Sequence, residues 1–362
     1  MSQPLEPGRF FLPGPTEVHR DVLAAQTGEM IGHRGQAIQD LLARIDAGLK
    51  TVFDTARPVI VSTSSATGLM EAGVRNGVLD GRVLSLVNGA FSERFSEIAV
   101  SCGNEVDVWE VEWGTVHDPG ALAERLSSGD YEAVTLSQSE TSTGALQDLE
   151  AIARVVGERE GTLLLVDSVT GIGGVEIHTD DWAVDYILTG SQKALALPPG
   201  LAFAVAGDAI LERSARSTNK GWYFDLEMLH SKIVQNQTPA TPAVSLLYSL
   251  DLQLRRIEAE TMPARWARHL AMQERTLEWV AGLAGSGVDI GVFAQEGHRS
   301  PTVTCVTTAR AKEVVAEMRS RGWVIGGGYG KLKDTTFRIG HMGDHTLDEL
   351  DELLGQLTDI LS

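Results

Sequence analysis

Lys193 closes an apolar run of the sequence, YILTGSQK at residues 186–193. A lysine this close to a protein interior is unusual, because burying an ammonium group costs several kcal/mol unless something compensates for it. One known compensation is chemical: the lysine amine forms a Schiff base with a carbonyl cofactor. The alternative is a lysine at a strand end whose head group reaches solvent. These residues alone leave both interpretations open.

A second apolar run, LLLVDSVT at residues 163–170, contains Asp167. Its continuous apolar character favours a strand buried on both faces, as in a parallel sheet. Ligands bind such sheets at the carboxyl ends of the strands, so Asp167 and Lys193 are expected at one site. An aspartate can keep a pyridine nitrogen protonated while a lysine holds an aldehyde on the same ring. The pair therefore indicates a pyridoxal phosphate enzyme.

Two further stretches are suited to anions. Residues 62–67, STSSAT, follow a short strand at 59–61 and precede a helix. Backbone N–H groups, hydroxyls and the helix dipole would face a phosphate there, whereas the alternative is an ordinary N-cap. Arg338 stands in an otherwise apolar strand. Its guanidinium is suited to a carboxylate held bidentately, and the alternative is an internal salt bridge.

Six motifs, in order along the chain, make the sequence similar to a known family. They are FLPGPT (11–16), MIGHR (30–34), ETSTG (140–144), the pair LLLVDSVTGIGG (163–174) and DYILTGSQKALALPPG (185–200), TPA (241–243) and FRIG (337–340). Together they resemble the class V aminotransferases, a branch of the fold-type-I pyridoxal phosphate enzymes. The closest subgroup is the alanine/serine–glyoxylate aminotransferase type, with its archaeal broad-specificity relatives. The resemblance extends along nearly the whole chain.

The resemblance implies which residues surround the cofactor ring. Lys193 would form the Schiff base, and Asp167 would pair with the ring nitrogen. Phe91 would stack on the ring, where some relatives have Trp, and Val169 would pack under it. The hydroxyl of Thr141 would lie beside the phenolic oxygen, where a donor stabilises the phenolate.

The resemblance also implies how the phosphate of pyridoxal 5'-phosphate is held. Ser65, Ala66 and Thr67 would bind it at the helix N-terminus. Ala66 replaces the usual glycine, a small departure that still permits close approach. Gln192 would donate to the phosphate from beside the lysine, and Thr241 would contact the phosphate bound by the other subunit. If so, the active site needs a homodimer.

The reaction that the resemblance implies has two halves. Arg338 would hold the carboxylate of the incoming amino acid, and Lys193 would move a proton as general base and then as acid. The amino group of alanine or serine would pass to a 2-oxo acid such as glyoxylate or pyruvate. Small amino acids and 2-oxo acids are therefore the expected small-molecule partners.

Three alternatives stay open. A broad-specificity aspartate or phosphoserine aminotransferase would need a second cationic group, for which Arg34 and Lys331 are candidates. A lyase such as a desulfurase needs a cysteine on a mobile loop, and Cys305 falls in a predicted strand instead. A non-catalytic cofactor-binding or scaffold protein is disfavoured, because the lysine, the aspartate and the arginine are all present.

Composition excludes several other functions. The formal net charge of −19 argues against nucleic-acid binding and against an anionic membrane surface. The two cysteines, Cys102 and Cys305, have no metal-binding spacing, so no metal is expected. Two thiols in 362 residues favour a reducing cytoplasm. Neither a signal peptide nor a membrane span is read from the sequence.

The alternation of strands and helices predicts an α/β fold, with a mostly parallel sheet in a large cofactor-binding domain and a smaller α/β C-terminal domain. The expected divisions are an N-terminal arm at 1–16, the large domain at 17–250 and the small domain at 251–362. Helical spacing runs from 20 to 53, and one long helix is expected over 246–269. The glycines at 326–330 suit a loop over the site.

Two segments are assigned to subunit contact. The cluster Trp222-Tyr223-Phe224 is expected to pack in a dimer or domain contact. The Pro-rich segment 237–243 cannot be a helix interior and is expected to cross toward the partner. Thr238 departs from human-type relatives, which have a tyrosine there, so that one contact is in doubt.

Overall fold

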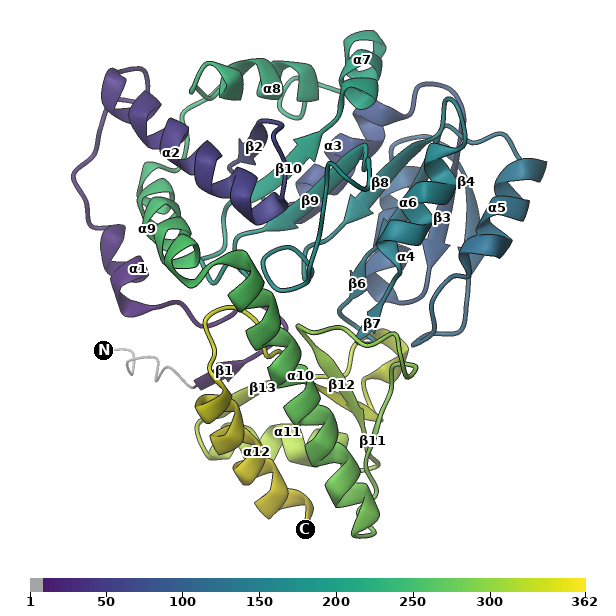
Figure 1. Cartoon of the computed structure of the whole chain (residues 1–362), viewed down its shortest axis with the longest axis vertical. Helices are drawn as coiled ribbons and strands as arrows, with labels where there is room; N and C mark the ends of the chain where they lie inside the picture. The colour runs from purple at the N-terminus through teal and green to yellow at the C-terminus, as the bar shows by residue number, and fades with distance from the viewer. Residues whose placement is uncertain (1–8) are drawn as a thin grey trace.

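The computed structural model of the chain describes residues 9–362, so the first eight residues of the expected arm lie outside the described part. Two sheets organise the molecule, a large one above and a small one below in Figure 1. The large sheet has the strand order β2-β10-β9-β8-β5-β3-β4. Its strands are β2 (Val59–Ser62), β3 (Arg82–Val87), β4 (Glu105–Glu110), β5 (Ala133–Ser137), β8 (Leu163–Asp167), β9 (Tyr186–Gly190) and β10 (Ala202–Ala206).

The large sheet is mostly parallel, as predicted. Only β10 runs against its neighbours, and it pairs antiparallel with both β9 and β2. Every residue of β5, β8 and β9 is buried, which accounts for their uninterrupted apolar sequences. The carboxyl ends of β8 and β9 lie side by side because the two strands are parallel neighbours.

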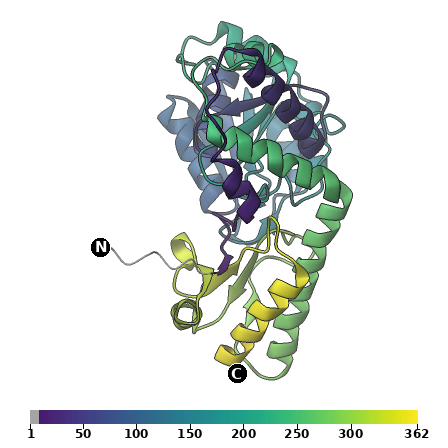
Figure 2. The same cartoon turned by 90° about the vertical axis from the view of Figure 1, so that its left-hand side faces the viewer.

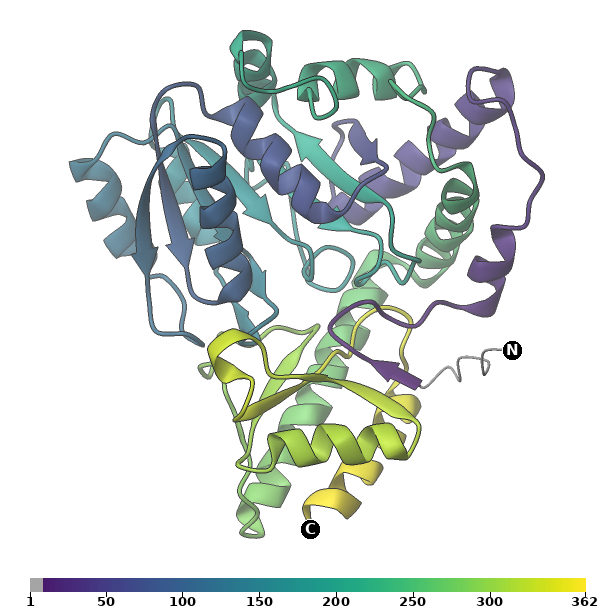
Figure 3. The same ribbon diagram turned by 180° about the vertical axis from the view of Figure 1, so that it is seen from behind.

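Helices cover both faces of the large sheet. Side chains of one core cluster come from α2 (Gln36–Phe53), α5 (Pro119–Ser128), α6 (Leu149–Gly157) and α9 (Val244–Glu260). A second cluster on the opposite face comes from α3 (Ala66–Gly77), α4 (Ala90–Ser101), α7 (Asp208–Arg216) and α8 (Leu226–Val234). Figure 3 looks onto the face that α3 and α4 cover. The two layers of helices leave the strand ends free to form a site.

The small sheet has the order β1-β13-β14-β12-β11. Its elements are β1 (Arg9–Phe11), β11 (Gly291–Val292), β12 (Thr304–Thr307), β13 (Trp323–Gly327) and β14 (Thr336–Ile339), with α10 (Met262–Gly285), α11 (Ala311–Ser320), α12 (Leu347–Leu361) and the 3-10 turn Gly330–Leu332. The short strands β6 (Ser139–Glu140) and β7 (Ala145–Leu146) form a hairpin, and α1 (Arg20–Ala25) precedes α2. Within residues 9–362, no helix combines the length and apolar character needed to cross a membrane.

Three local expectations were wrong, and a fourth, the helical spacing over 20–53, was confirmed only in part, since α2 carries the buried residues from Ile38 to Val52. Residues Arg9–Phe11 were expected to lack regular structure, but they pair in parallel with β13 of the small sheet. The region 20–53 holds two helices, because residues 26–35 between α1 and α2 are not helical. The expected helix over 246–269 breaks at Thr261, where φ is 71° and Pro263 follows. Two of the glycines expected in a loop, Gly326 and Gly327, end strand β13.

The break at Thr261 lets the chain change direction between the two sheets. α9 packs on the large sheet as far as Ile257. α10 then runs down beside the small domain and next to α12, as Figure 2 shows. The division at residue 250 stays a prediction.

Candidate active site

The structure brings Lys193 and Asp167 to the same edge of the large sheet. Asp167 ends β8, and Lys193 lies three residues beyond the end of β9. Both residues are buried, with 9% of the surface of Lys193 and 4% of the surface of Asp167 exposed. Burial lowers the pKa of the Lys193 amine to about 8, assisted by the positive charges of Arg338 and Arg94 and opposed by Asp167. A lysine with this pKa gives up its proton much more readily than an exposed lysine, as nucleophilic and base chemistry requires.

The carboxylate of Asp167 is fixed by two hydrogen bonds. One oxygen accepts from the backbone N–H of Val169 at 2.8 Å, and the other accepts from the Ser137 hydroxyl at 2.9 Å. Burial nevertheless raises the pKa of this carboxyl to about 6. Because desolvation disfavours the lone carboxylate, the site favours a cationic partner for it.

The segment FLPGPT (11–16) lies directly against the lysine. The carbonyl of Pro13 accepts a hydrogen bond from Lys193 Nζ. A Cβ atom on Gly14, whose φ is +105°, would stand 2.6 Å from Nζ, so only glycine fits there. The Thr16 backbone N–H donates to Gln192 O at 3.1 Å, and its hydroxyl donates to Lys193 O at 3.2 Å. This motif is therefore in direct contact with the amine and with the backbone beside it.

The N-terminus of α3 lies close to the side chain of Gln192, the residue before Lys193. Ser65 is the N-cap residue and makes no side-chain capping bond, and no acidic residue occupies the first turn. The side chain of Gln192 lies nearby, since a Cβ on Gly190 would meet Gln192 Oε1 at 2.9 Å and Ala66 Cβ at 3.3 Å. Free N–H groups at the start of α3 and the Thr67 hydroxyl can therefore receive a phosphate.

Aromatic, aliphatic and hydroxyl side chains complete the surroundings of the amine. Phe91 begins the first turn of α4, and its ring centre lies 6.0 Å from Lys193 Nζ. Val169, two residues after Asp167, packs with the core cluster on the α3 and α4 face. The Thr141 hydroxyl shares a hydrogen bond of 3.0 Å with the Thr170 hydroxyl.

Arg338 lies in β14 of the small sheet and reaches the same site. It is 9% exposed, and it donates to Gly327 O at 2.9 Å and to Thr141 O at 3.2 Å. Among residues 9–362 no carboxylate lies within ion-pair distance of its guanidinium, so an internal salt bridge does not explain it. Burial lowers the pKa of this arginine, and its unused donors are available to a carboxylate.

Thr241 lies at the surface of the chain. It is exposed and lines a surface pocket with Thr63, Trp222 and Tyr223. Trp222 and Tyr223 are 62% and 47% exposed, while the Tyr223 hydroxyl donates to Thr63 O at 3.0 Å. Phe224, the third member of this aromatic cluster, is partly buried and packs on the core cluster beside α3, whereas Trp222 stays exposed within one chain.

The second cations suggested by the sequence are engaged elsewhere. Arg34 donates to the carbonyls of Thr238 and Pro239 at 2.6 and 3.1 Å. Lys331 stands 4.1 Å from the Trp113 ring and pairs with Glu110 at 3.5 Å.

Sequence reasoning overlooked the role of Glu140. Its buried carboxylate accepts from the N–H groups of Phe91 and Ser92 at 3.1 and 2.9 Å and from the Ser142 hydroxyl at 2.6 Å. It therefore caps α4 and fixes Phe91. The signal was an acidic residue directly after the buried strand β5, inside a motif that had already been singled out.

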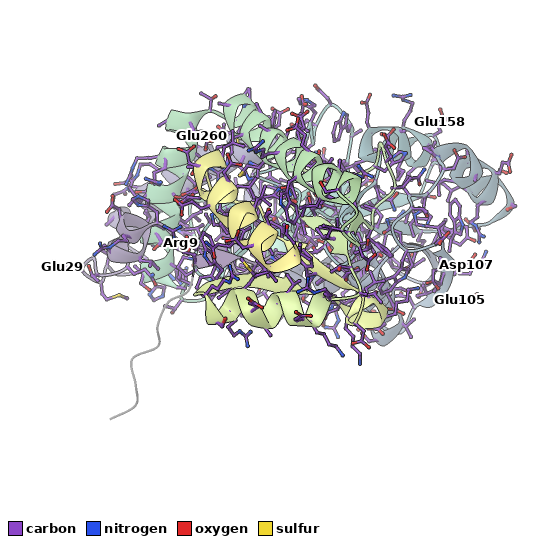
Figure 4. The ribbon with its side chains drawn as sticks, turned by 90° about the horizontal axis from the view of Figure 1, so that it is seen from below. Arg9, Glu29, Glu105, Asp107, Glu158 and Glu260 are labelled. Atoms are coloured by element: carbon purple, nitrogen blue, oxygen red, sulfur yellow. The ribbon has the colours of Figure 1, made fainter. Side chains whose placement is uncertain are left out.

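Arg265, at the start of α10, was also overlooked. Its guanidinium donates to Ala194 O, next to Lys193, at 2.7 Å and to Gly173 O at 3.0 Å. It also pairs with Asp344 at 3.0 Å and with Glu260 at 2.7 Å, while only 1% of its side chain is exposed. Figure 4 shows Glu260 where α9 gives way to α10. Arg265 thus links the loop that carries Lys193 to Asp344, which follows strand β14 of the small sheet.

Two negative expectations concern sulfur and metals. Cys305 is fully buried in β12, and burial raises the pKa of its thiol to about 11, so it is not a loop nucleophile. Among residues 9–362, no three His, Cys, Asp or Glu side chains group as a metal site would require. The structure therefore offers no support for desulfurase chemistry.

A family model described as aminotransferase class-V matches residues 17–328. The chain belongs to this family. Alanine–glyoxylate aminotransferase from Nostoc sp. has a solved structure with a TM-score of 0.93 and 31% identity, covering 100% of this chain and 98% of its own. Serine–glyoxylate aminotransferase from Arabidopsis thaliana is 31% identical over 370 residues, 98% of this chain and 90% of its own. A Synechococcus protein named soluble hydrogenase, small subunit, is 33% identical over 341 residues, 92% of this chain and 88% of its own.

This class-V aminotransferase is a pyridoxal-phosphate-dependent transaminase with the fold-type-I architecture. The family and the fold imply the cofactor, and the residues present fit it. A buried amine, a buried carboxylate without a charged partner in hydrogen-bond contact, and an uncapped helix N-terminus lie around the same strand ends. These groups match the aldehyde, the ring nitrogen and the phosphate of pyridoxal phosphate.

Proposed function

We propose that this aminotransferase moves the amino group of a small L-amino acid, alanine or serine, to a 2-oxo acid such as glyoxylate or pyruvate, with Lys193 as the residue that bonds the cofactor. One observation carries the proposal: the Lys193 amine, the Asp167 carboxylate and the Arg338 guanidinium converge from two sheets onto one buried site. Relatives named for alanine–glyoxylate and serine–glyoxylate transfer support the choice of substrates.

Pyridoxal phosphate, when bound, supplies an aldehyde that takes up the amino group and a ring that accepts electron density. Arg338 binds the α-carboxylate of the substrate with its unused guanidinium donors. Lys193 Nζ removes the proton from the substrate Cα and later returns a proton, because a pKa of about 8 suits both steps near neutral pH. Asp167 would pair with the ring nitrogen and favour its protonated form.

The remaining site residues would bind the cofactor and take no part in the reaction. Phe91 and Val169 would bound the space for the ring, and the Thr141 hydroxyl, which shares a hydrogen bond with the Thr170 hydroxyl, would lie beside the phenolic oxygen. Ser65, Ala66, Thr67 and Gln192 would hold the phosphate at the start of α3.

The proposal includes a homodimer. Thr241 and the neighbouring aromatic side chains Trp222 and Tyr223 are exposed, and a second copy would bury them. Thr241 would then contact the phosphate of the partner subunit. A cytoplasmic location remains part of the proposal, supported by two unpaired cysteines, Cys102 and Cys305.

Product analysis tests the activity. Purified enzyme with added pyridoxal phosphate, alanine or serine, and glyoxylate should form glycine together with pyruvate or hydroxypyruvate in equal amounts. Lys193→Ala should abolish turnover while the far-ultraviolet circular dichroism spectrum stays unchanged. Full activity in that variant, or sulfide release from cysteine in place of transamination, would overturn the assignment.

A further inference from the structure

Tyr329 links the small sheet to helix α4 beside the site. It follows strand β13 and directly precedes the 3-10 turn Gly330–Leu332. Its ring stacks on the ring of Phe91, with 5.3 Å between the two ring centres. Its hydroxyl accepts a hydrogen bond of 2.9 Å from Arg94, about one turn further along α4. Tyr329 therefore connects a loop of the small sheet with an aromatic side chain of the proposed cofactor site.

The same ring is also in contact with Arg338. The guanidinium carbon of Arg338 stands over the Tyr329 ring, 5.5 Å from its centre. An aromatic face attracts a cation within about 6 Å, and the attraction grows where water is excluded. Arg338 is buried, and its hydrogen bonds among residues 9–362 go to the carbonyls of Gly327 and Thr141 rather than to a carboxylate. The face of Tyr329 is therefore a direct electrostatic contact of the arginine that is proposed to bind substrate.

Tyr329 completes the support that fixes the orientation of this guanidinium. Nε of Arg338 donates to Gly327 O at 2.9 Å, and Nη1 donates to Thr141 O at 3.2 Å. Two such bonds still allow the planar group to tilt about the line that joins them, whereas a ring beside the group restricts the tilt. Within residues 9–362, the second N–H of Nη1 and both N–H groups of Nη2 are left for the oxygens of a carboxylate. The direction in which these donors point therefore depends on Tyr329.

Phe91 supports Tyr329 within the site. The buried carboxylate of Glu140 accepts from the backbone N–H of Phe91 at 3.1 Å and so fixes its position. The ring centre of Phe91 lies 6.0 Å from Lys193 Nζ. A row of contacts therefore runs from Lys193 through Phe91 and Tyr329 to Arg338. This row relates the amine to the guanidinium, two groups that must both meet one substrate molecule.

We propose that Tyr329 is a positioning residue for transamination: its ring, stacked on Phe91, holds the guanidinium of Arg338 in the orientation that binds the α-carboxylate of the substrate. This inference rests on the proposed function, because it takes from there the carboxylate on Arg338 and the reacting amine of Lys193. Tyr329 acts through Arg338 and needs no contact with the substrate or the cofactor. The ring carries the effect, whereas the hydroxyl bonded to Arg94 is dispensable.

Two variants separate the ring of Tyr329 from its hydroxyl. The readout is kcat and KM for alanine, with glyoxylate as the acceptor. Tyr329→Leu keeps an apolar side chain but removes the aromatic face, so KM for alanine should rise about tenfold while kcat changes by less than about twofold. Tyr329→Phe keeps the face and loses the hydroxyl, so its KM for alanine should stay within about twofold of that of the unaltered enzyme. An equally large rise in Tyr329→Phe would overturn the role of the ring.

A double-mutant cycle tests whether Tyr329 acts through Arg338. Arg338→Gln removes the guanidinium, so nothing remains for the ring to orient. Adding Tyr329→Leu to that variant should then change KM for alanine by less than about twofold, instead of the rise of about tenfold expected in the unaltered background. A role of Tyr329 that is independent of Arg338 would give the same factor in both backgrounds and would refute the inference.

Lys331→Gln is the matched control. Lys331 lies two residues after Tyr329, where it stands 4.1 Å from the centre of the Trp113 ring and pairs with Glu110 at 3.5 Å. The variant removes these exposed contacts of the same loop but leaves Tyr329 and Arg338 in place, so KM for alanine should change by less than about twofold. A rise of about tenfold in this control would assign the effect to anchoring of the loop and not to the ring of Tyr329.

The affinity for the cofactor distinguishes the remaining outcomes. Absorbance titration with pyridoxal phosphate should give the same dissociation constant for Tyr329→Leu and for the unaltered protein. A rise in this constant with an unchanged KM for alanine would place the role of Tyr329 at Phe91 and would overturn the inference while the proposed function stands. Absence of turnover of both alanine and serine by the unaltered enzyme would refute the proposed function, and this inference with it.

Discussion

We expect Arg265→Met to destabilise the protein by breaking a buried charge cluster. Arg265 donates to two backbone carbonyls and pairs with Asp344 and Glu260, while almost none of its side chain meets solvent. Removing one member of a buried ion cluster typically costs about 3–5 kcal/mol, because the remaining charges lose their partner. The variant is nearly apolar and similar in length, so loss of packing contributes little.

The structure places the loss at the lower end of that range. Glu260 keeps Arg268 at 2.6 Å, and Asp344 keeps Arg256 at 3.3 Å and Gln253 at 3.0 Å. The two carbonyls, however, lose their donor. We therefore expect the free energy of unfolding to fall by about 3 kcal/mol at pH 7.

Acid should reduce this loss. Burial would raise the pKa of Asp344, but Arg265, Gln253 and Arg256 hold it below the ordinary value of 3.8. A carboxyl with a depressed pKa stabilises the fold above its unfolded pKa and loses that contribution as the pH falls through its folded pKa. Without Arg265 the carboxyl protonates at higher pH, so the difference between the two proteins should shrink as the pH falls from 7 toward 4.

Urea unfolding of both proteins with saturating pyridoxal phosphate measures the effect. The control is Arg154→Met, whose exposed pair with Glu150 should be worth less than about 0.5 kcal/mol. A loss in Arg265→Met no larger than in this control, or a loss that grows in acid, would refute the reasoning.

Three further changes test the site. Lys193→Met removes a buried ammonium whose pKa is lowered to about 8 from 10.5. The free energy of unfolding of the cofactor-free protein, measured with urea, should therefore rise by about 3 kcal/mol at pH 7. That gain should decline as the pH rises from 8 toward 10.5, and a gain that does not depend on pH would contradict the burial of a charge. Asp167→Asn cannot hold a proton on the ring nitrogen as a carboxylate does, so stopped-flow spectra should show the alanine half-reaction slowed by about 100-fold or more. Arg338→Gln should reduce kcat/KM for alanine by about 10- to 100-fold, mainly through KM in steady-state assays, whereas an effect on kcat alone would contradict its role in binding.

The sequence predicted the parts of the site that depend on local pattern. The runs at 163–167 and 186–190 are apolar throughout because both faces of their strands are covered, so their carboxyl ends and hence Asp167 and Lys193 could be placed. The start of α3 could also be placed from the sequence, because a segment rich in Ser and Thr is typical of a helix N-terminus, and its role in phosphate binding stays a prediction.

Contacts between distant residues could not be predicted in this way. Arg94 meets Tyr329 from 235 positions away, and β1 pairs with β13 across an even longer separation. A pattern of neighbours carries no information about such pairs. The break at Thr261, by contrast, had a signal in the sequence. Pro263 lies within the expected helix, but the apolar periodicity on either side of it was given more weight.

The most direct test of the central claim is the visible absorption spectrum of the enzyme loaded with pyridoxal phosphate and given one substrate at a time. The account predicts that alanine or serine bleaches the visible absorption band of the bound cofactor and that glyoxylate or pyruvate restores this band, in repeated cycles. The Lys193→Ala variant should show no such cycle. A band that every amino acid leaves unchanged in the unaltered enzyme would contradict the account.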